Sequence, residues 1–318
     1  MITEPMLDIV IVNWNTNEQV HDCVRSIGQA AQTGFTLKQV FVVDNASTDG
    51  SMDGLTQIPV PLRTIMNPQN LGFATACNQG ARAGNAEYIL FLNPDTQLFA
   101  DSLHSPIAFM QRAENQQIGI CGIHLIGDDG EPTIAAARFP TMRVLLGKMS
   151  GLSKLLPALF PTHMMAAGEL TKSQSVDQII GAYFLMRRSV YDLCNGFDER
   201  FFVYFEEVDL ALRAKEAGFE SYYFAEASAY HKGGGATDAV RAHRLFYSMR
   251  SRMQYAQKHF SSIETVFLFF MTFLLEFPAR LLRAAARGSR QQVVETCSGF
   301  AMLIRSYLAQ RKQQGARS

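Results

Sequence analysis

Blocks of apolar and polar residues alternate along the first hundred positions and predict strands and helices in turn. Four apolar runs are rich in β-branched residues, which is typical of strands buried on both faces of a parallel sheet. These strands are predicted at residues 7–15, 38–47, 62–66 and 88–95. Apolar residues recur at helical spacing between them, at residues 18–32 and 73–83. This order of elements predicts an α/β fold with a doubly wound, mostly parallel central sheet flanked by helices.

The second half of the chain predicts further elements of both kinds. The polar turn at residues 128–130 indicates a hairpin. A helix is predicted from residue 208 to a glycine at 218, and a strand at residues 221–231. We expect one α/β domain over residues 1–240 and a basic, helical C-terminal extension over residues 241–318.

Two adjacent acids, Glu206 and Glu207, follow an aromatic run and stand directly before residue 208, at the start of the predicted helix, and Asp209 comes shortly after them. Acids in the first turn of a helix suit the helix dipole, so capping explains all three. An aromatic wall would also desolvate a carboxylate and raise its pKa toward that of a working general base. Both interpretations stay open on this stretch alone.

Polar side chains stand at the ends of three predicted strands. They are Asn13 on the first strand, Asp44 on the second, and Asn93 and Asp95 on the fourth. A turn or a cap explains each of them singly. Ligands of open α/β sheets collect beyond the carboxyl ends of the strands, so we expect these side chains to outline one site.

Several residues near these strand ends suit an anionic ligand and a metal ion. Gly72 precedes a predicted helix, whose first amides could approach an anionic group. Carboxylate and amide oxygens at Asn93 and Asp95 suit Mg²⁺ or Mn²⁺ held partly by a substrate phosphate. Three glycines follow His231 and would let a loop fold over a bound anion.

Two common nucleotide-binding classes fit the sequence poorly. No GxGxxG follows the first strand, and no GxxxxGK[ST] occurs anywhere. The sequence therefore disfavours a nicotinamide-dependent dehydrogenase and a P-loop NTPase.

Composition and charge describe a globular chain with one basic end. The chain has 318 residues, 47% of them hydrophobic, which is enough to bury a full core. The formal net charge is zero, but residues 241–318 contain thirteen Lys or Arg against three Glu. This end therefore carries a surplus of ten positive charges, and residues 1–240 carry minus ten. Such asymmetry indicates that the basic end meets an anionic surface.

The C-terminal extension contains an apolar run at residues 266–275, followed by four arginines between residues 280 and 290. Ten apolar residues are too few to span a bilayer, which needs about twenty. We expect a basic amphipathic helix that lies in the cytoplasmic interface of a membrane, the alternative being a helix packed on the sheet. Residues 143–160 mix apolar and basic positions and are expected to form a flap that faces the acceptor or a membrane.

The five cysteines are scattered and form no CxxC pair. We expect them to be reduced, mostly buried and cytosolic, rather than part of a disulfide frame or a zinc site. The N-terminus shows no cationic segment before an apolar one, so no export is expected.

Taken together, the motifs resemble those of the family-2 inverting glycosyltransferases of GT-A fold, most closely their bacterial rhamnosyltransferase-like branch. The resemblance covers about residues 7–237. The motifs that carry it are Ile11-Val-Asn-Trp-Asn15, Val43-Asp-Asn-Ala-Ser-Thr-Asp-Gly50, Asn70-Leu-Gly-Phe-Ala74 with Asn78 and Gly80, Leu92-Asn-Pro-Asp95, Gly181-Ala182 with Gly196-Phe-Asp-Glu-Arg-Phe-Phe202, and Glu206-Glu-Val-Asp-Leu210.

The resemblance implies a role for each candidate residue. The nucleotide base would lie against Val12, Asn13 and Asp44, and the nucleotide would be lined by Gly72 and Asn78. Asn93 and Asp95 would hold a divalent cation, Mg²⁺ or Mn²⁺, and the diphosphate, with His231 in the metal shell. Glu207 would be the catalytic base, with Glu206 as the fallback, and Asp209 of the same motif would help to bind substrate. Two positions depart from the family pattern, since Asn93 stands where many relatives have Asp and Glu207 where Asp is commoner.

The implied activity is transfer of a sugar, with dTDP-L-rhamnose as the preferred donor, to a lipid-linked glycan in cell-surface polysaccharide synthesis. The enzyme would act at the inner face of the plasma membrane, in one inverting displacement, and without nucleic acid as a partner. A non-catalytic sugar-nucleotide-binding relative is one alternative. A sugar nucleotidyltransferase is another, but it needs a glycine-rich basic loop after the first strand, and residues 13–19 contain no Gly, Lys or Arg.

Overall fold

The computed structural model describes residues 4–233 and 240–315, and these form two compact units. The first unit comprises residues 4–139, 164–202 and 206–233. The second comprises residues 140–163, 203–205 and 240–315. The predicted division after residue 240 separates the C-terminal helices from the sheet, but the structure also assigns the predicted flap to the second unit.

The first unit is built on a nine-stranded sheet in the order β3-β2-β1-β4-β10-β6-β11-β5, with β8 paired to β11. Its strands are β1 Met6–Asn13, β2 Thr36–Asp44, β3 Leu62–Met66, β4 Tyr88–Leu92, β5 Thr96–Leu98, β6 Ile118–Ile126, β8 Gln174–Val176, β10 Tyr183–Arg187 and β11 Glu220–His231. A two-stranded sheet adds β7 Ala136–Ala137 and β9 Gln178–Ile179.

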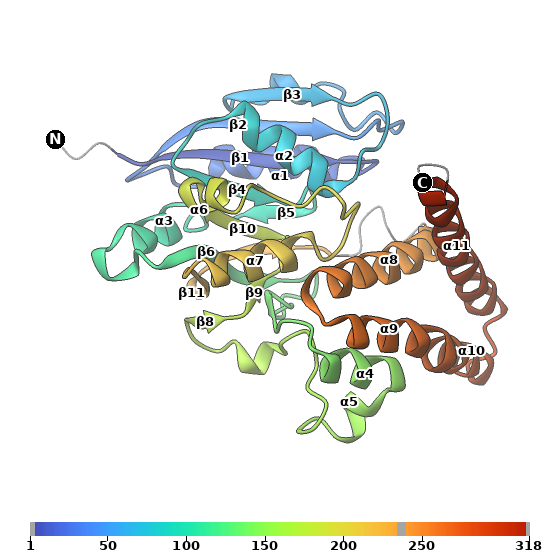
Figure 1. Cartoon of the computed structure of the whole chain (residues 1–318). Helices are drawn as coiled ribbons and strands as arrows, with labels where there is room; N and C mark the ends of the chain where they lie inside the picture. Colours follow the sequence, from blue (N-terminus) through green and yellow to red (C-terminus); the bar gives the residue numbers. More distant parts are fainter. Residues whose placement is uncertain (1–3, 234–239, 316–318) are drawn as a thin grey trace. The chain divides into compact units, whose positions relative to one another are not determined.

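Strand direction confirms the mostly parallel sheet and adds one feature that was not predicted. The strands β1 to β4 run parallel, and β6 and β11 run in the same direction because β10 is antiparallel to both β4 and β6. Within the described residues only β5, β8 and β10 run the other way. The reversed strand β10 therefore joins two parallel blocks in the middle of the sheet (Figure 1).

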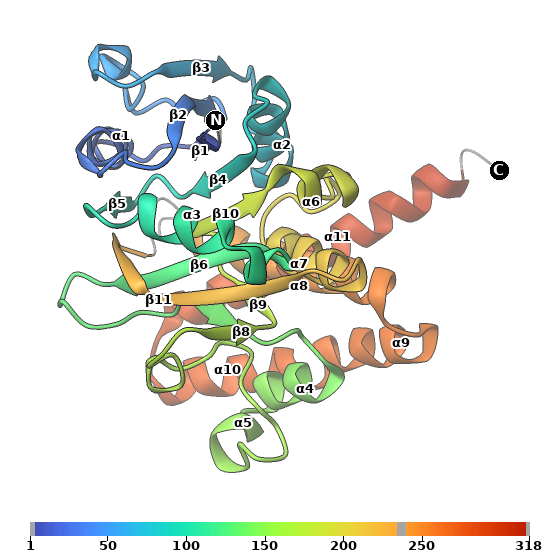
Figure 2. The ribbon, with the colours of Figure 1, turned by 90° about the vertical axis from the view of Figure 1, so that its left-hand side faces the viewer.

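Helices cover both faces of the sheet, as a doubly wound fold requires. Figure 2 shows α1 and α2 on opposite sides of β1 and β2. The helices of the first unit are α1 Gln19–Gln29, α2 Phe73–Ala83, α3 His104–Gln111, α6 Arg188–Leu193 and α7 Glu206–Glu216. Burial explains the apolar runs, since every residue of β1 except Met6 is buried and so is all of β4.

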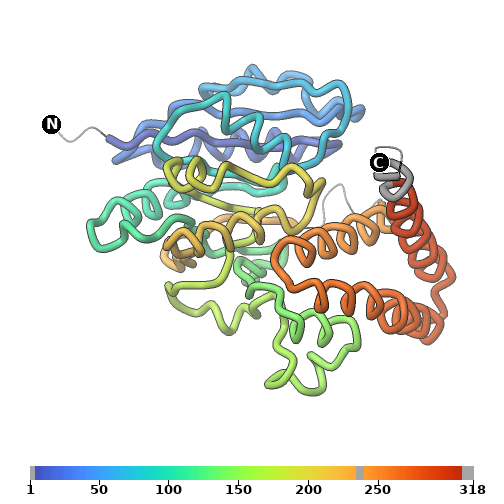
Figure 3. Tube along the Cα trace, in the orientation of Figure 1, coloured from blue at the N-terminus to red at the C-terminus, as the bar shows by residue number. Residues whose placement is uncertain are grey.

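The second unit is helical. Its helices are α4 Met142–Ser150, α5 Leu152–Leu155, α8 Arg241–His259, α9 Ser262–Met271, α10 Phe277–Ala286 and α11 Arg290–Gly315. Figure 3 traces the last four in chain order, from orange to red. Two apolar clusters hold them together, one around Leu145, Met253 and Leu268, and one around Met249, Phe300 and Leu303.

A π-helical segment, Thr272–Glu276, joins α9 to α10 without a break. The continuous helical stretch of 25 residues, 262–286, is therefore much longer than the apolar run of ten seen in the sequence. By length and composition alone it is long and apolar enough to cross a membrane.

Candidate functional site

The ends of β1 and β2 meet in a buried polar network. The amide nitrogen Nδ2 of Asn13 lies 2.8 Å from Oδ1 of Asp44, 2.8 Å from the hydroxyl of Ser51 and 3.0 Å from the hydroxyl of Ser47. The backbone N–H of Ser47 donates to the other carboxylate oxygen of Asp44 at 3.0 Å. Asn13 and Asp44 are 0% and 1% exposed, and Val12 is buried beside them. These contacts order the loop after β2, and contact with a nucleotide base stays a prediction for all three residues.

Gly72 begins α2 and brings the helix against the chain that leads to the paired acids. Its φ of +90° lies in the left-handed region, and a Cβ at this position would lie 2.5 Å from the carbonyl oxygen of Phe202. The N–H of Phe73 donates to that same oxygen at 2.6 Å, and the N–H of Gly72 donates to Oδ1 of Asn70 at 2.9 Å. These two amides, expected to face an anion, are therefore used inside the protein. Gly72 instead fixes the segment just before Glu206.

Replacing Gly72 with alanine is expected to lower both stability and activity. The side chain would strain the left-handed backbone, at about 1–3 kcal/mol, and also push Phe202 away from α2. Gly54→Ala is the matched control, because Gly54 has a φ of +72° but nothing within 4 Å of its added Cβ. Thermal unfolding and transfer rates should show a larger loss for Gly72→Ala. Equal losses in the two variants would show that the contact with Phe202 has no importance.

Asp95 and His231 lie together at the other side of the strand ends. The turn from Asn93 to Asp95 is held by two bonds to the carbonyl of Ala182, from the N–H of Asn93 at 3.1 Å and the hydroxyl of Thr96 at 3.2 Å. Thr96 then pairs with His231 in the β5–β11 ladder. This register places Oδ1 of Asp95 3.5 Å from Nε2 of His231, and both side chains are largely buried.

The pair Asp95 and His231 fits part of a divalent metal site. Two ligands at right angles on one octahedral Mg²⁺ are about 3 Å apart, close to the observed separation. Within residues 4–233 and 240–315, no cluster of three or more His, Cys, Asp or Glu that could hold a metal occurs. Any ion here would need oxygens from a substrate or water, as Mg²⁺ usually does. Gly234 and Gly235, expected to cover an anion, lie outside the described residues.

Glu206 and Glu207 form the first turn of α7 and are poorly solvated. Glu206 is buried at 5% exposure and Glu207 is half-buried. In each carboxylate, Oε2 is buried and has no hydrogen-bond partner among the described residues. Burial, and then the charge of Glu207, raise the pKa of Glu206 well above its usual range, while burial raises the pKa of Glu207. A raised carboxyl pKa is what a general base near neutral pH needs.

The backbone before these acids is strained. Tyr204 and Phe205 have φ of +68° and +69°, which is the left-handed region that large side chains avoid. Each such residue costs on the order of 1–3 kcal/mol, and such strain clusters at functional sites. Tyr204 and Phe205 directly precede Glu206, so this strained segment leads the chain into α7.

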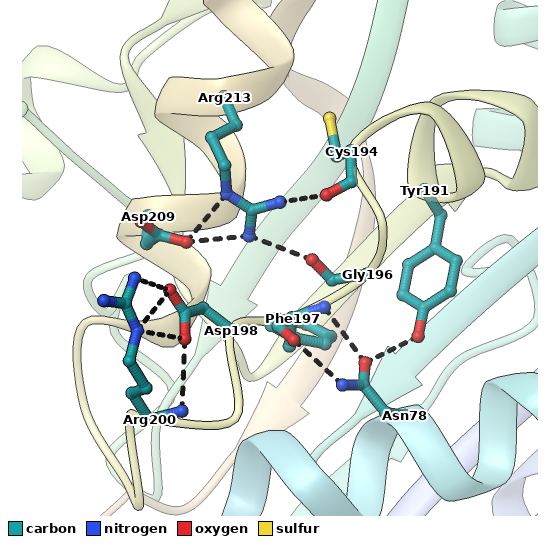
Figure 4. A network of polar contacts seen from close by, with 9 residues as sticks. All are labelled: Asn78, Tyr191, Cys194, Gly196, Phe197, Asp198, Arg200, Asp209 and Arg213. Atoms are coloured by element: carbon teal, nitrogen blue, oxygen red, sulfur yellow. Dashed lines mark hydrogen bonds and ion pairs between the residues drawn. The ribbon is translucent and has the colours of Figure 1, made fainter. Parts of the chain in front are cut away.

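A second polar network holds the loop between α6 and α7 (Figure 4). Nε of Arg213 donates to Asp209 at 2.8 Å, and its two Nη groups donate to the carbonyls of Cys194 and Gly196. Asp209 is fully buried, so its carboxylate anchors Arg213 and the loop.

The side chain of Asn78 on α2 also holds this loop, through other residues. Its Oδ1 accepts from Tyr191 and from the N–H of Phe197, and its Nδ2 donates to the carbonyl of Phe197 and to Glu199. Asn78 is fully buried. Asp209 and Asn78 thus position the loop in this structure, and substrate contact stays a prediction for both.

The structure brings the predicted residues together in two pairs and one network. Asn13 meets Asp44, Asp95 meets His231, and Glu206 adjoins Glu207 in one helical turn. Sequence reasoning missed the hydroxyls of Ser47 and Ser51, although both lie in the polar loop that directly follows Asp44.

A family model and two curated proteins match this chain. The model of the family described as glycosyl transferase family 2 matches residues 8–193. The chain is 27% identical, over 252 residues, to an N-acetylglucosaminyl-diphospho-decaprenol L-rhamnosyltransferase of Mycobacterium tuberculosis, covering 76% of this chain and 80% of that protein. It is 24% identical over 196 residues to the rhamnosyltransferase WbbL of Escherichia coli, covering 58% of this chain and 70% of WbbL.

Similarity to a solved structure supports the predicted fold. The mannosyltransferase PcManGT from Pyrobaculum calidifontis, solved in complex with GDP-Man and Mn²⁺, superposes with a TM-score of 0.55 at 15% sequence identity. The superposition covers 95% of this chain and 81% of that one. The predicted GT-A fold is thereby confirmed.

Proposed function

Since the chain belongs to glycosyl transferase family 2 and is a glycosyltransferase, we propose that it transfers L-rhamnose from dTDP-L-rhamnose to a lipid-linked glycan in cell-surface polysaccharide synthesis. The observation that carries the proposal is the similarity to two rhamnosyltransferases, one of them matched over 76% of this chain. The name of that relative specifies a prenyl-diphosphate-linked N-acetylglucosamine, so this is the acceptor class to test first.

The reaction is an inverting displacement at the anomeric carbon. The acceptor hydroxyl gives its proton to Glu207 as its oxygen bonds to the anomeric carbon from the face opposite the diphosphate. The bond from that carbon to the β-phosphate oxygen breaks, and the electron pair leaves with dTDP. The half-buried carboxylate of Glu207, with its raised pKa and one oxygen that has no hydrogen-bond partner among the described residues, supports this role. Glu206 is more deeply buried and is the less accessible base.

The donor would bind at the carboxyl ends of the strands. Asp95 and His231, with Asn93 beside them, would hold a divalent cation, and their short separation supports the assignment. Such a cation would neutralise the charge that develops on the departing diphosphate. The ordered loop after β2, with Asn13 and Asp44 at its base, would bind the thymine end.

Thermal shift with a panel of nucleotide sugars, with and without Mn²⁺, tests the donor. A donor at about 100 times its Kd stabilises the folded state by about 2.7 kcal/mol, a shift of several degrees. We expect dTDP-L-rhamnose with Mn²⁺ to give the largest shift and to support transfer to a prenyl-diphosphate-linked N-acetylglucosamine. A larger shift and faster transfer with a UDP or GDP sugar would reject rhamnose as the donor sugar.

Asp95→Asn is expected to remove the part of this thermal shift that depends on Mn²⁺ and to lower transfer about 100-fold, because one charged metal ligand is lost. Asp129→Asn, at an exposed acid in the turn after β6, is the matched control and should behave like the parent. A metal response that survives in Asp95→Asn would show that the cation binds elsewhere.

A further inference from the structure

The helical stretch 262–286, which comprises α9, the π-helical segment and α10, presents a row of exposed apolar side chains along one face. Ile263 is 83% exposed, Leu274 is 68% exposed and Leu282 is 71% exposed. The full row, here called the apolar stripe, is Ile263, Val266, Phe267, Phe270, Leu274 and Leu282. Its members recur mostly every three or four residues, which is the spacing of one helix face. An exposed apolar surface of this length is typical of an interaction site.

The other face of the same helices is packed inside the second unit. Leu268, Thr272, Glu276 and Ala284 are 0–3% exposed and recur every four or eight residues. Leu268 contacts the apolar cluster that contains Met253 of α8. The described residues of the second unit therefore pack against one side of this stretch, and the apolar stripe lies on the other side.

A buried charge cluster argues against a membrane crossing by these helices. Glu276 lies within residues 262–286, and its Oε2 is 2.6 Å from Nη2 of Arg252 on α8. Arg280 binds the other oxygen of Glu276 at 2.8 Å. A crossing helix would carry this cluster into hydrocarbon, where each charged side chain costs about 2.5–3.5 kcal/mol even on permissive scales. A helix that lies in the interface keeps these charges inside the protein.

Charge next to the stripe identifies the partner. Residues 277–290 contain four arginines and no acid. Three of these arginines, Arg283, Arg287 and Arg290, are exposed. Each basic side chain near an anionic bilayer contributes about 1 kcal/mol to binding. A helix with an apolar face and basic residues beside it is the usual form of an interfacial membrane anchor.

We propose that the apolar stripe inserts into the boundary between headgroups and acyl chains of an anionic bilayer, with α9 and α10 parallel to the membrane surface. The inference rests on the proposed function for its purpose, since it keeps the enzyme at the surface that holds a lipid-linked acceptor. The binding itself requires neither donor nor acceptor.

Sedimentation of the full chain with vesicles tests the proposal. Vesicles of phosphatidylglycerol and phosphatidylethanolamine are compared with vesicles of phosphatidylcholine alone. We expect binding to the anionic vesicles, a loss of at least tenfold in the variant F270E/L274E, and no loss in Leu193→Glu. Leu193 is the matched control because it is 63% exposed on α6 of the first unit. Arg283→Gln with Arg287→Gln should weaken binding to anionic vesicles only, and added salt should reduce that difference.

Two further measurements show whether the apolar stripe lies on the membrane, belongs to a helix that crosses it, or pairs with a second copy of the chain. Alkaline carbonate should release the bound protein, whereas retention in the membrane would overturn the proposal in favour of a spanning helix. Gel filtration that shows a dimer lost in F270E/L274E, without vesicle binding by the parent, would also overturn it.

The donor experiment separates this proposal from the proposed function. The donor thermal shift is measured without vesicles and should be unchanged in F270E/L274E, which also shows that the variant is folded. If the parent binds vesicles but no nucleotide sugar, only the proposed function fails. If it binds donor but no vesicles, only the proposal that the apolar stripe binds a membrane fails.

Discussion

Glu207→Gln is expected to lower kcat for glycosyl transfer by about 10²- to 10⁴-fold while donor binding stays nearly unchanged, because a positioned general base contributes about that much. Glutamine keeps the shape of the side chain but cannot take the proton of the acceptor hydroxyl. Transfer is measured with saturating donor, and donor binding is measured by thermal shift in the same buffer. Full activity in Glu207→Gln would reject Glu207 as the base.

Glu206→Gln is the matched control, because it changes the neighbouring acid in the same helical turn. Burial and the charge of Glu207 raise the pKa of Glu206 well above its usual range, which favours its protonated form near neutral pH. Glutamine resembles that neutral form, so Glu206→Gln should keep most of the activity. The reverse pattern, with activity lost in Glu206→Gln and kept in Glu207→Gln, would assign the base to Glu206.

The pH dependence of the rate supplies a second readout on Glu207. A base must be ionised to act, so kcat falls as the pH falls through its pKa. Burial raises the pKa of Glu207, so this acidic limb should lie above the usual Glu pKa of about 4.3. The residual kcat of Glu207→Gln should not show this fall at acidic pH.

The raised pKa values of Glu206 and Glu207 should make the protein less stable as the pH rises, whereas a salt-bridged acid makes it more stable. A carboxyl whose pKa is raised by folding binds more protons in the native state, so stability decreases as the pH rises from the unfolded pKa to the folded one. Glu206→Gln should therefore increase stability at pH 8 more than at pH 4. The same gain at both pH values would contradict the raised pKa of Glu206.

The regular part of the fold could be predicted from the sequence because burial on both faces gives a clear apolar signal. The strand at residues 62–66 and the helix at 73–83 have the predicted bounds, and the ends of β1 and β2 meet as expected. The reversed strand β10 was not predicted. Its apolar residues look the same whether the strand runs parallel or antiparallel, so only its pairing with β4 and β6 reveals the direction.

The candidate site was harder to predict where it depends on strain and on contacts distant in sequence. The left-handed backbone of Tyr204 and Phe205 has no sequence signal, since aromatic residues avoid this conformation. The ion pair between Arg213 and Asp209, one helical turn apart, was not predicted. Asn78 bonds residues more than one hundred positions away, which no local pattern indicates.

The extent of the second unit also depends on contacts between residues distant in sequence. Charge counts and the apolar run identified a basic helical end, but residues 140–163 belong to this unit through contacts such as that of α4 with the π-helical segment. The length of the helical stretch 262–286 also exceeds the apolar run, because Glu276 is accommodated by partners from α8 and α10.

Arg252→Met is expected to lower the free energy of unfolding of the second unit by about 3 kcal/mol, because removing one partner leaves a buried charge without its counterion. The side chains of Arg252 and Glu276 are 8% and 4% exposed, and Arg252 also donates to Thr272 at 2.9 Å. Arg280 remains as a second, partly exposed partner of Glu276, which keeps the loss at the lower end of the usual range. Urea unfolding followed by helical circular dichroism measures the change.

The double variant R252M/E276L should recover most of that loss, because apolar residues of similar size replace the whole pair. Arg283→Met is the matched control, since Arg283 is exposed on the same helix as Arg280, and its effect should stay within about 0.5 kcal/mol. A double variant as unstable as Arg252→Met would show that packing around Arg252, rather than an unpaired charge, causes the loss.

Acid titration distinguishes these causes further. Burial alone would raise the pKa of Glu276, but the charges and hydrogen bonds of Arg252 and Arg280 lower it to about 2. A carboxyl whose pKa is lowered by folding stabilises the native state above its unfolded pKa, and this stabilisation is lost as the pH falls through the folded pKa. The stability of the parent relative to R252M/E276L should therefore decrease between about pH 4.5 and pH 2. A difference that does not change over this range would show that Glu276 is not held ionised by its arginines.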